Sequence, residues 1–467
     1  MIGRIRLTSI AMLALLSFTL PTTAQVVGNG SRQSTDEAQA FFDKGQAYLD
    51  AGQYKEAVEA YKRGLRLNPN NADAYANLGY AFSLLGKSTE DLDATKKALQ
   101  IEPNHPYANT RLCYAYSKLN QYEEAIQACE QAIQYNPRNG ESYANLGYAY
   151  DHLKRPTEAI EALRKSIEVN PNNGDTFNKL GWAYIQMGQY EDAIKALRQS
   201  IQLDPNYMTA YNNLGNAYFH LGRHAEAADT FRQAIRTKPE EFWPHMNLGR
   251  AYFALEQYKK AIEELKEAIR IDPKSADAYI GLGLAHIKMA EYEEAIETFS
   301  QLIGLKPQEA NAFRSRSYAY LYLARGEAAA ADAQKYLELS GGENKSDVYM
   351  ILVAHFGYRQ AGRDADASRI LEEGSTKANI KQWPYPVIRY LHREMSAQEL
   401  LALATDGDKK TEAEAYIGMD LSLAGKRDEA LTYLRWVKDN GNKNFVEYSL
   451  AISESNRIEA AKEKSQP

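Results

Sequence analysis

The chain has 467 residues, 44% of them hydrophobic and 25% charged, which is enough apolar material for a folded, water-soluble body and excludes general disorder. Its 55 basic and 61 acidic residues give a formal charge of −6, which argues against specific nucleic-acid binding. Two cysteines and eight histidines without HExxH spacing disfavour metal chemistry, and we expect neither a metal nor a cofactor.

Residues 1–24 have the order of a secretory signal peptide. Arg4 and Arg6 precede a largely apolar stretch of 14 residues, and small residues end the segment at Ala24. This stretch is shorter than the ~20 residues that a membrane-spanning helix needs. We therefore expect cleavage after Ala24, export to the periplasm or the exterior, and no stable membrane insertion afterwards; a retained membrane anchor is the alternative. Residues 25–35, rich in Gly, Ser, Asn and Gln, predict a flexible lead-in.

Residues 36–308 contain a repeat marked by prolines at intervals of 34 residues. These prolines are Pro69, Pro103, Pro137, Pro171, Pro205, Pro239, Pro273 and Pro307. With this proline as position 32, position 8 is glycine except in the third copy, position 20 is alanine except in the second, and position 11 is aromatic except in the eighth. The pattern resembles the tetratricopeptide repeat, a helix-turn-helix unit of 34 residues. This resemblance implies an all-α fold, a right-handed solenoid of about eight regular repeats.

The periodicity of each unit agrees with that resemblance. In the sixth copy Tyr211, Leu214 and Tyr218 follow helical spacing and predict one buried stripe. The glycine at position 8 costs the helix about 1 kcal/mol relative to alanine, so we expect the second helix to approach it closely at the small residue of position 20. One unit cannot bury its own apolar face, so units stack. Asp91 and Thr95 replace apolar residues in the second copy and predict a loosened joint.

Beyond residue 308 the repeat becomes irregular. We expect degenerate repeat-like units over 309–379, then an irregular joint, a repeat-like helix pair and a C-terminal cap over 380–457, and a frayed tail over 458–467. The Trp-Pro-Tyr-Pro element from Trp383, the helix pair and a Phe-Val-Glu-Tyr element together resemble the C-terminal part of the envelope TPR adaptor lipoproteins of Gram-negative bacteria. The resemblance implies an extracytoplasmic adaptor for other proteins. The cysteine on which such lipoproteins are acylated is missing near the predicted cleavage point.

One register of the first helices, position 6, is a candidate peptide-binding ladder. The asparagines of this register are Asn77, Asn145, Asn213 and Asn247, with Arg111 and Lys179 between them. Asparagine is unfavourable inside a helix, and its amide offers both donors and an acceptor for a peptide backbone. The pattern resembles the asparagine ladder of the long TPR superhelix of O-linked N-acetylglucosamine transferase, which holds extended peptides. The alternative is that these asparagines bond the adjacent unit.

Position 9 of the same helices carries a run of aromatic residues. They are Tyr80, Tyr114, Tyr148 and Trp182, followed at the same position by Asn216 and Arg250. On an exposed face they predict a contact stripe for a ligand, because rings bury a large area at low entropic cost. The alternative is that they belong to the repeat core. Histidines at position 13, His152 and His220, are more typical of solvated side chains than of catalysis.

The two cysteines, Cys113 and Cys129, stand at positions 8 and 24 of the third copy, equally far from the turn between its helices. Antiparallel helices bring such positions to similar heights, so an oxidising compartment could link them. Two buried thiols are the alternative.

These features together favour an exported, non-catalytic scaffold that binds an extended peptide or a partner protein in a concave groove. An enzyme or enzyme subunit is a second hypothesis, although the residues after Pro307 still read as helix pairs and leave no α/β segment for a nucleotide-sugar site. Self-assembly through exposed repeat ends is the third.

Overall fold

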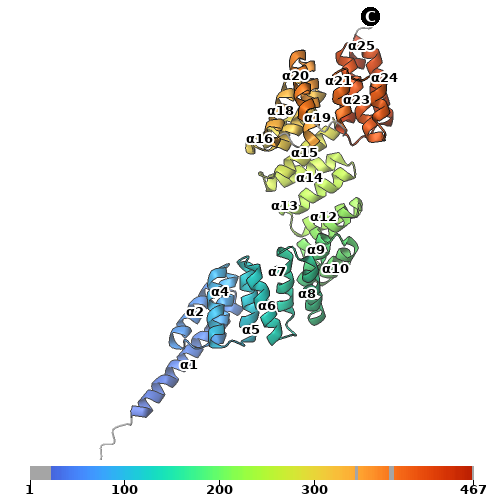
Figure 1. The fold of residues 1–467 in the computed structure, drawn as a ribbon. Helices are drawn as coiled ribbons and strands as arrows, with labels where there is room; N and C mark the ends of the chain where they lie inside the picture. The colour runs from blue at the N-terminus through green and yellow to red at the C-terminus, as the bar shows by residue number, and fades with distance from the viewer. Residues whose placement is uncertain (1–22, 342–344, 378–382, 465–467) are drawn as a thin grey trace, which may run out of the picture. The chain divides into compact units, whose positions relative to one another are not determined.

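The computed structural model describes residues 23–341, 345–377 and 383–464, and the described residues form helices joined by turns, without strands (Figure 1). The all-α prediction is confirmed. Contacts divide the chain into an N-terminal unit, Met1–Pro205, and a C-terminal unit, Asn206–Pro467. Almost all of the predicted signal peptide lies outside the described residues.

The N-terminal unit is an α-α solenoid of five helix pairs, in which each odd-numbered helix is the first of its pair. Its helices are α1 (Thr23–Asp50), α2 (Tyr54–Leu67), α3 (Ala72–Leu84), α4 (Ser88–Ile101), α5 (Pro106–Lys118), α6 (Tyr122–Tyr135), α7 (Gly140–His152), α8 (Pro156–Val169), α9 (Gly174–Gln186) and α10 (Tyr190–Leu203). Neighbouring first helices, such as α5 and α7, touch one another. We call the side that they form the first-helix face.

The predicted flexible lead-in is wrong, because α1 begins at Thr23 and residues 25–35 are helical. Once the first turns of a helix exist, each added residue gains a hydrogen bond at little further cost. The helix is anchored further along by Ala38 and Phe42, which are buried.

The glycine at position 8 does form a close contact, but the side chain that fills it differs from the prediction. A Cβ atom on Gly147 would lie 2.6 Å from Leu163, and one on Gly181 would lie 2.4 Å from Leu197. Both leucines stand at position 24 of their units. The small residue at position 20 permits the approach, while the larger residue at position 24 fills the space.

The second copy replaces this apolar contact with a buried ion pair. A Cβ atom on Gly79 would lie 2.8 Å from both Asp91 Oδ1 and Thr95 Oγ1. Thr95 donates to Asp91 at 3.2 Å, and Asp91 pairs with Arg111 of the next unit. Only 1% of Asp91 and 4% of Arg111 is exposed. The predicted loosened joint is therefore wrong, because the polar residues bond each other across the repeat boundary.

The C-terminal unit begins as a second α-α solenoid of five helix pairs. Its helices are α11 (Met208–His220), α12 (His224–Thr237), α13 (Phe242–Ala254), α14 (Tyr258–Ile271), α15 (Ala276–Lys288), α16 (Tyr292–Leu305), α17 (Ala310–Tyr322), α18 (Gly326–Ser340), α19 (Lys345–Gln360) and α20 (Asp364–Lys377). The residues predicted as degenerate units thus form two further helix pairs, α17–α18 and α19–α20.

The chain then turns through a cis peptide bond at Trp383–Pro384 into two short helices and a three-helix cap. The short helices are α21 (Tyr385–Leu391) and α22 (Ala397–Leu403), and the cap consists of α23 (Gly407–Leu423), α24 (Arg427–Asn440) and α25 (Val446–Lys464). The predicted frayed tail is wrong for residues 458–464, which continue α25. Ile458 is buried in the cap core, and Lys462 pairs with Asp428 of α24.

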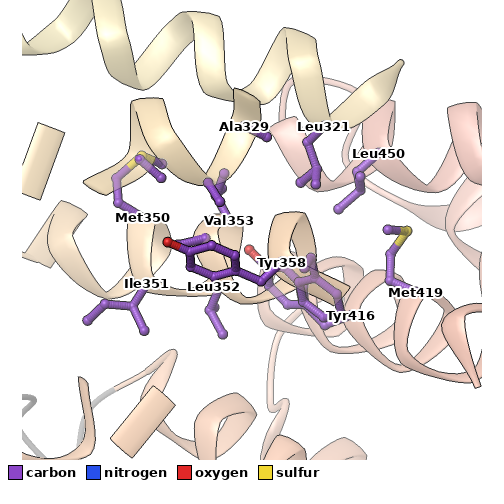
Figure 2. Packing of buried hydrophobic residues seen from close by; sticks show 14 of the residues in the cluster. Leu321, Ala329, Met350, Ile351, Leu352, Val353, Tyr358, Tyr416, Met419 and Leu450 are labelled. Atoms are coloured by element: carbon purple, nitrogen blue, oxygen red, sulfur yellow. The ribbon is translucent and has the colours of Figure 1, made fainter. Parts of the chain in front are cut away.

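The cap packs on the first-helix face of the last repeats. Figure 2 shows Leu321 of α17 and Val353 of α19 in one hydrophobic core with Tyr416 of α23 and Leu450 of α25. Polar contacts extend this packing, since the hydroxyl of Tyr322 donates to the carbonyl of Val446 at 3.0 Å. The cap reaches back to α15, since Lys288 of α15 donates to the carbonyl of Lys443 at 2.9 Å.

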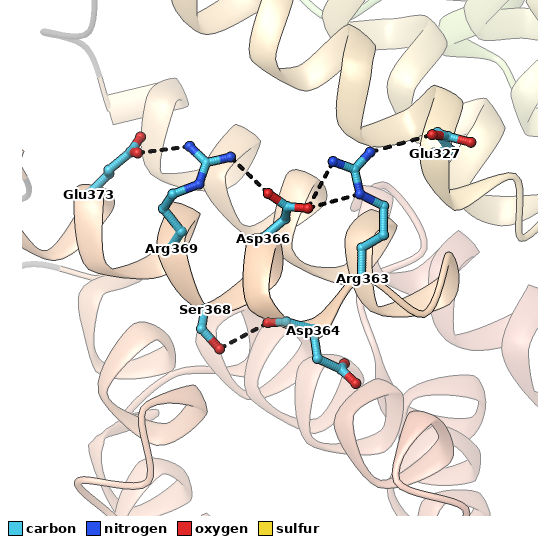
Figure 3. Close-up of polar contacts among 7 residues, drawn as sticks. All are labelled: Glu327, Arg363, Asp364, Asp366, Ser368, Arg369 and Glu373. Atoms are coloured by element: carbon cyan, nitrogen blue, oxygen red, sulfur yellow. Dashed lines mark hydrogen bonds and ion pairs between the residues drawn. The ribbon is translucent and has the colours of Figure 1, made fainter.

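Helix α20 presents a chain of ion pairs on its outer surface. Figure 3 shows Arg363 and Arg369 on either side of Asp366, with Glu327 of α18 and Glu373 at the two ends. Exposed pairs of this kind contribute about 0–1 kcal/mol each. They lie outside the candidate sites described below.

Within the described residues, no helix is long and apolar enough to cross a bilayer. The same residues contain no group of three or more His, Cys, Asp or Glu side chains arranged to hold a metal ion.

Candidate functional site

On the first-helix face of the N-terminal unit, the structure brings the predicted aromatic residues together with cations. Tyr80 of α3 is 37% exposed, and the guanidinium of Arg111 lies 5.3 Å from the centre of its ring and 4.8 Å from that of Tyr114. Lys118 also lies 5.1 Å from the centre of the Tyr114 ring. Cations at these distances are attracted to the ring faces.

The stripe continues on α7 and α9. Lys179 of α9 lies 5.8 Å from the Tyr148 ring and pairs with Asp175 at 2.6 Å. Trp182 hydrogen-bonds Asp151, and burial raises the pKa of that carboxyl despite the neighbouring donor. Burial also raises the pKa of Tyr148. Tyr114, Tyr148 and Trp182 are half-buried whereas Tyr80 is exposed, and their role in ligand contact stays a prediction.

The position-6 asparagines lie deeper than the aromatic stripe. Between 6% and 8% of Asn145, Asn213 and Asn247 is exposed. Asn247 Nδ2 donates to Asn212 Oδ1 of the preceding repeat at 3.1 Å, and Asn77 hydrogen-bonds the Tyr61 hydroxyl. Two of these amides thus bond other helices of the array, in agreement with the structural alternative. Asn145 Nδ2 has no acceptor within the described residues, so peptide binding by this ladder stays a prediction.

The two cysteines are joined in the structure. Cys113 and Cys129 form a disulfide between α5 and α6, with Cα atoms 4.8 Å apart. They occupy the positions that hold glycine and a large apolar side chain in most other copies. The bond is fully buried and links the two helices of the third repeat.

The C-terminal unit contains an apolar groove that the sequence did not single out. The groove has a volume of about 230 Å³, and its lining includes Phe219, Arg250, Phe253, Gly281 and Leu284. Of these, only Arg250 was a predicted site residue; it is exposed, and its guanidinium lies 5.1 Å from the centre of the Phe219 ring. Phe219 and Phe253 are exactly one repeat apart at position 12, and this recurrence was a usable signal.

A larger cavity of about 600 Å³ adjoins this groove, since both are lined by Phe253 and Leu284. Its walls come from first helices and from the cap. Burial lowers the pKa of Lys288 and raises that of Glu447, because each charged form is removed from water. The wall also contains Tyr318, whose pKa burial raises strongly. The cavity thus combines aromatic surface with charges of both signs.

Comparison with protein families agrees with this architecture. Models described as tetratricopeptide or TPR repeats match residues 218–266, 249–289 and 276–309. A model described as the C-terminal domain of cilia and flagella-associated protein 70 matches residues 8–241, half of the chain. The chain belongs to the tetratricopeptide-repeat (TPR) family.

Several solved TPR structures are similar to this one. A tetratricopeptide repeat protein from Parabacteroides merdae is 21% identical, with 54% of this chain and 99% of that chain covered and a TM-score of 0.43. The pilF protein of Pseudomonas aeruginosa is 21% identical, with coverages of 46% and 96% and a TM-score of 0.41. MamA from Desulfovibrio magneticus is 24% identical, with coverages of 37% and 97% and a TM-score of 0.34. No curated protein matches the sequence of this TPR chain.

Proposed function

We propose that this TPR protein is a non-catalytic scaffold that binds an extended, mainly apolar segment of a partner protein on the first-helix face of its C-terminal unit. The observation that carries the proposal is the apolar groove lined by Phe219, Phe253 and Leu284, which leads into the larger cavity. TPR solenoids in general present such faces as extended binding surfaces.

The shape of the groove favours a peptide backbone. Gly281 stands at position 6, where four other copies have asparagine, and the side chain of Leu265 lies against it, so this part of the floor is apolar. Leu284 is 37% exposed beside it and offers an apolar contact. At the groove's edge, Arg250 makes no ion pair within the described residues and offers donors to the carbonyl groups of a bound segment.

A phage-displayed library of random linear 12-residue peptides, panned against the full chain, tests this proposal. We expect the selected peptides to be rich in apolar residues and to bind about tenfold more weakly to the Leu284→Glu variant, because a charge would enter the groove. Leu305→Glu is the matched control, since Leu305 is also an exposed leucine but lies outside the groove. Absence of any enriched peptide, or equal binding to the two variants, would refute the proposal.

We also propose that the protein is exported to an oxidising compartment, as its resemblance to envelope adaptors implies. The signal-like order of residues 1–24 and the Cys113–Cys129 disulfide support this. Mass spectrometry of the protein from the envelope fraction of its source cells should find an N-terminus at Gln25 and a cross-linked cysteine peptide without reductant. A full-length N-terminus with two free thiols in the cytosol would contradict export.

A further inference from the structure

The larger cavity is closed on one side by the chain's own cap. Asn444, Phe445 and Val446 line it next to the first helices, and Lys288 Nζ donates to the carbonyl of Lys443 at 2.9 Å. Its volume of about 600 Å³ lies within the ~300–1,000 Å³ range of small-ligand sites. A partner segment that follows the groove into the cavity would therefore contact the cap residues at its far side. The end of a chain fits such a closed cavity better than the middle of a chain does.

One wall of the cavity carries a buried carboxyl group, whose pKa burial raises. Glu447, in the first turn of α25, is 3% exposed, and its Oε1 accepts a hydrogen bond from Tyr416 at 2.7 Å. Glu447 has no ion pair within the described part of the chain. Glu412 also lines this wall and accepts hydrogen bonds from Tyr349 and Trp383. Burying a carboxylate without a cation is costly, so a cationic group in the cavity would be stabilised.

A positive charge lines the same cavity. Arg314 of α17 is half-buried and has no hydrogen-bonding or ion-pair partner for its guanidinium among the described residues. Lys288 adds a second cation on the first-helix side. The cavity thus has two ionisable poles, the carboxyl of Glu447 and the guanidinium of Arg314, which form no ion pair with each other within the described residues.

Much of the remaining wall is aromatic. Tyr318, Tyr322, Tyr349 and Phe445 all line the cavity. Aromatic surface of this kind packs against an alkyl stem and attracts a cation at its end. A ligand that fits both poles therefore has a carboxylate, an apolar stem and a cationic tip.

We propose that this cavity binds the C-terminal lysine of an extended partner segment, with the carboxylate at Arg314 and the side-chain ammonium at Glu447. This inference rests on the proposed function, because it assigns the larger cavity to the C-terminal residue of the segment bound in the groove. A free α-carboxylate and a lysine side chain occur together only at a chain terminus. Specificity arises because a ligand lacking either charge leaves one pole of the cavity desolvated and unpaired.

The probe is 6-aminohexanoate, which has both charges on one alkyl stem, compared with hexylamine and hexanoate, which each have one. Dissociation constants are measured by ligand-observed NMR titration of the full chain. We expect 6-aminohexanoate to bind at least about tenfold more tightly than either singly charged probe. Arg314→Gln should weaken 6-aminohexanoate and hexanoate and leave hexylamine unchanged, whereas Glu447→Gln should weaken 6-aminohexanoate and hexylamine. Arg427→Gln, an exposed arginine of α24, is the matched control.

Equal binding of all three probes, or no effect of Arg314→Gln, would overturn the inference. Arg314→Gln removes a side chain without a partner, so this test does not depend on whether the buried Glu447→Gln variant folds. The displayed peptides of the previous section are fused through their C-termini and carry no free carboxylate. If they bind while 6-aminohexanoate does not, the scaffold proposal stands and the C-terminal lysine site is refuted.

Discussion

The buried pair of Asp91 and Arg111 allows a quantitative test of how the second and third repeats are joined. In the Arg111→Met variant the carboxyl of Asp91 stays buried without its cation. Loss of one partner of a buried pair costs about 3–5 kcal/mol. The carboxyl can escape part of this cost only by taking up a proton.

Because protonation depends on pH, the loss of stability in Arg111→Met also depends on pH. Burial already raises the pKa of Asp91 to about 6 even with Arg111 beside it, against an ordinary value of 3.8. Relative to the parent, whose carboxyl has this pKa of about 6, keeping the carboxyl protonated costs the variant about 1 kcal/mol at pH 7 and almost nothing at pH 5, at 1.36 kcal/mol per pH unit. The folded-state pKa is raised, so the variant should be most destabilised at pH 7 and recover as the pH falls toward 4.

Hydrogen exchange measured by mass spectrometry gives the local free energy of opening of α4 and α5 in the full chain at both pH values. The control is the double variant Asp91→Ala with Arg111→Met, which restores the alanine found at position 20 in the other copies. We expect the double variant to be at least as stable as the parent at pH 7, because it leaves no unpaired charge. No loss of stability in Arg111→Met at pH 7, or an equal loss at the two pH values, would refute the reasoning.

Three further predictions concern packing, titration and the disulfide. Gly283→Ala should lower the free energy of unfolding by about 1–3 kcal/mol, because its Cβ would lie 2.4 Å from the ring of Phe299. Gly304→Ala has no atom within 4 Å of its Cβ and should stabilise its helix by about 0.5–1 kcal/mol. Thermal unfolding followed by circular dichroism compares the two variants. Burial raises the pKa of Glu414 to about 7, whereas the pKa of this carboxyl in the unfolded chain is near 4.5. The free energy of unfolding is therefore highest below pH 4.5 and falls as the pH rises through 7. The melting temperature of Glu414→Gln should be a few degrees above that of the parent at pH 8 and equal to it at pH 4. Reducing the Cys113–Cys129 bond, with 16 residues of separation, should cost about 3 kcal/mol in urea unfolding, and a melting curve unchanged by reductant would contradict a structural role.

The candidate sites were only partly predictable from the sequence. Position 9 indicated the aromatic stripe of Tyr80, Tyr114 and Tyr148, because one helical register places residues on one face whatever the partner. The burial of Arg111 was not predictable, since Asp91 lies in another repeat and only packing brings the two together. Phe219 and Phe253 were visible as a recurring position but not as a groove, because the space beside them depends on which neighbouring side chains are small.

The sequence by itself determined the helix pairs and their stacking. The interval of 34 residues, the helical spacing of apolar positions and the proline after each second helix are local signals, because they act within one or two turns of chain. Only the tertiary structure showed that the side chain at position 24 packs against the glycine at position 8, and that α25 packs on the first helices. It also decided that Arg314 and Glu447 line one cavity, although 133 positions separate them. Contacts between distant segments depend on the complementarity of folded surfaces. Because the cap lies outside the periodic part of the chain, the repeat spacing in the sequence does not predict its contacts with the repeats.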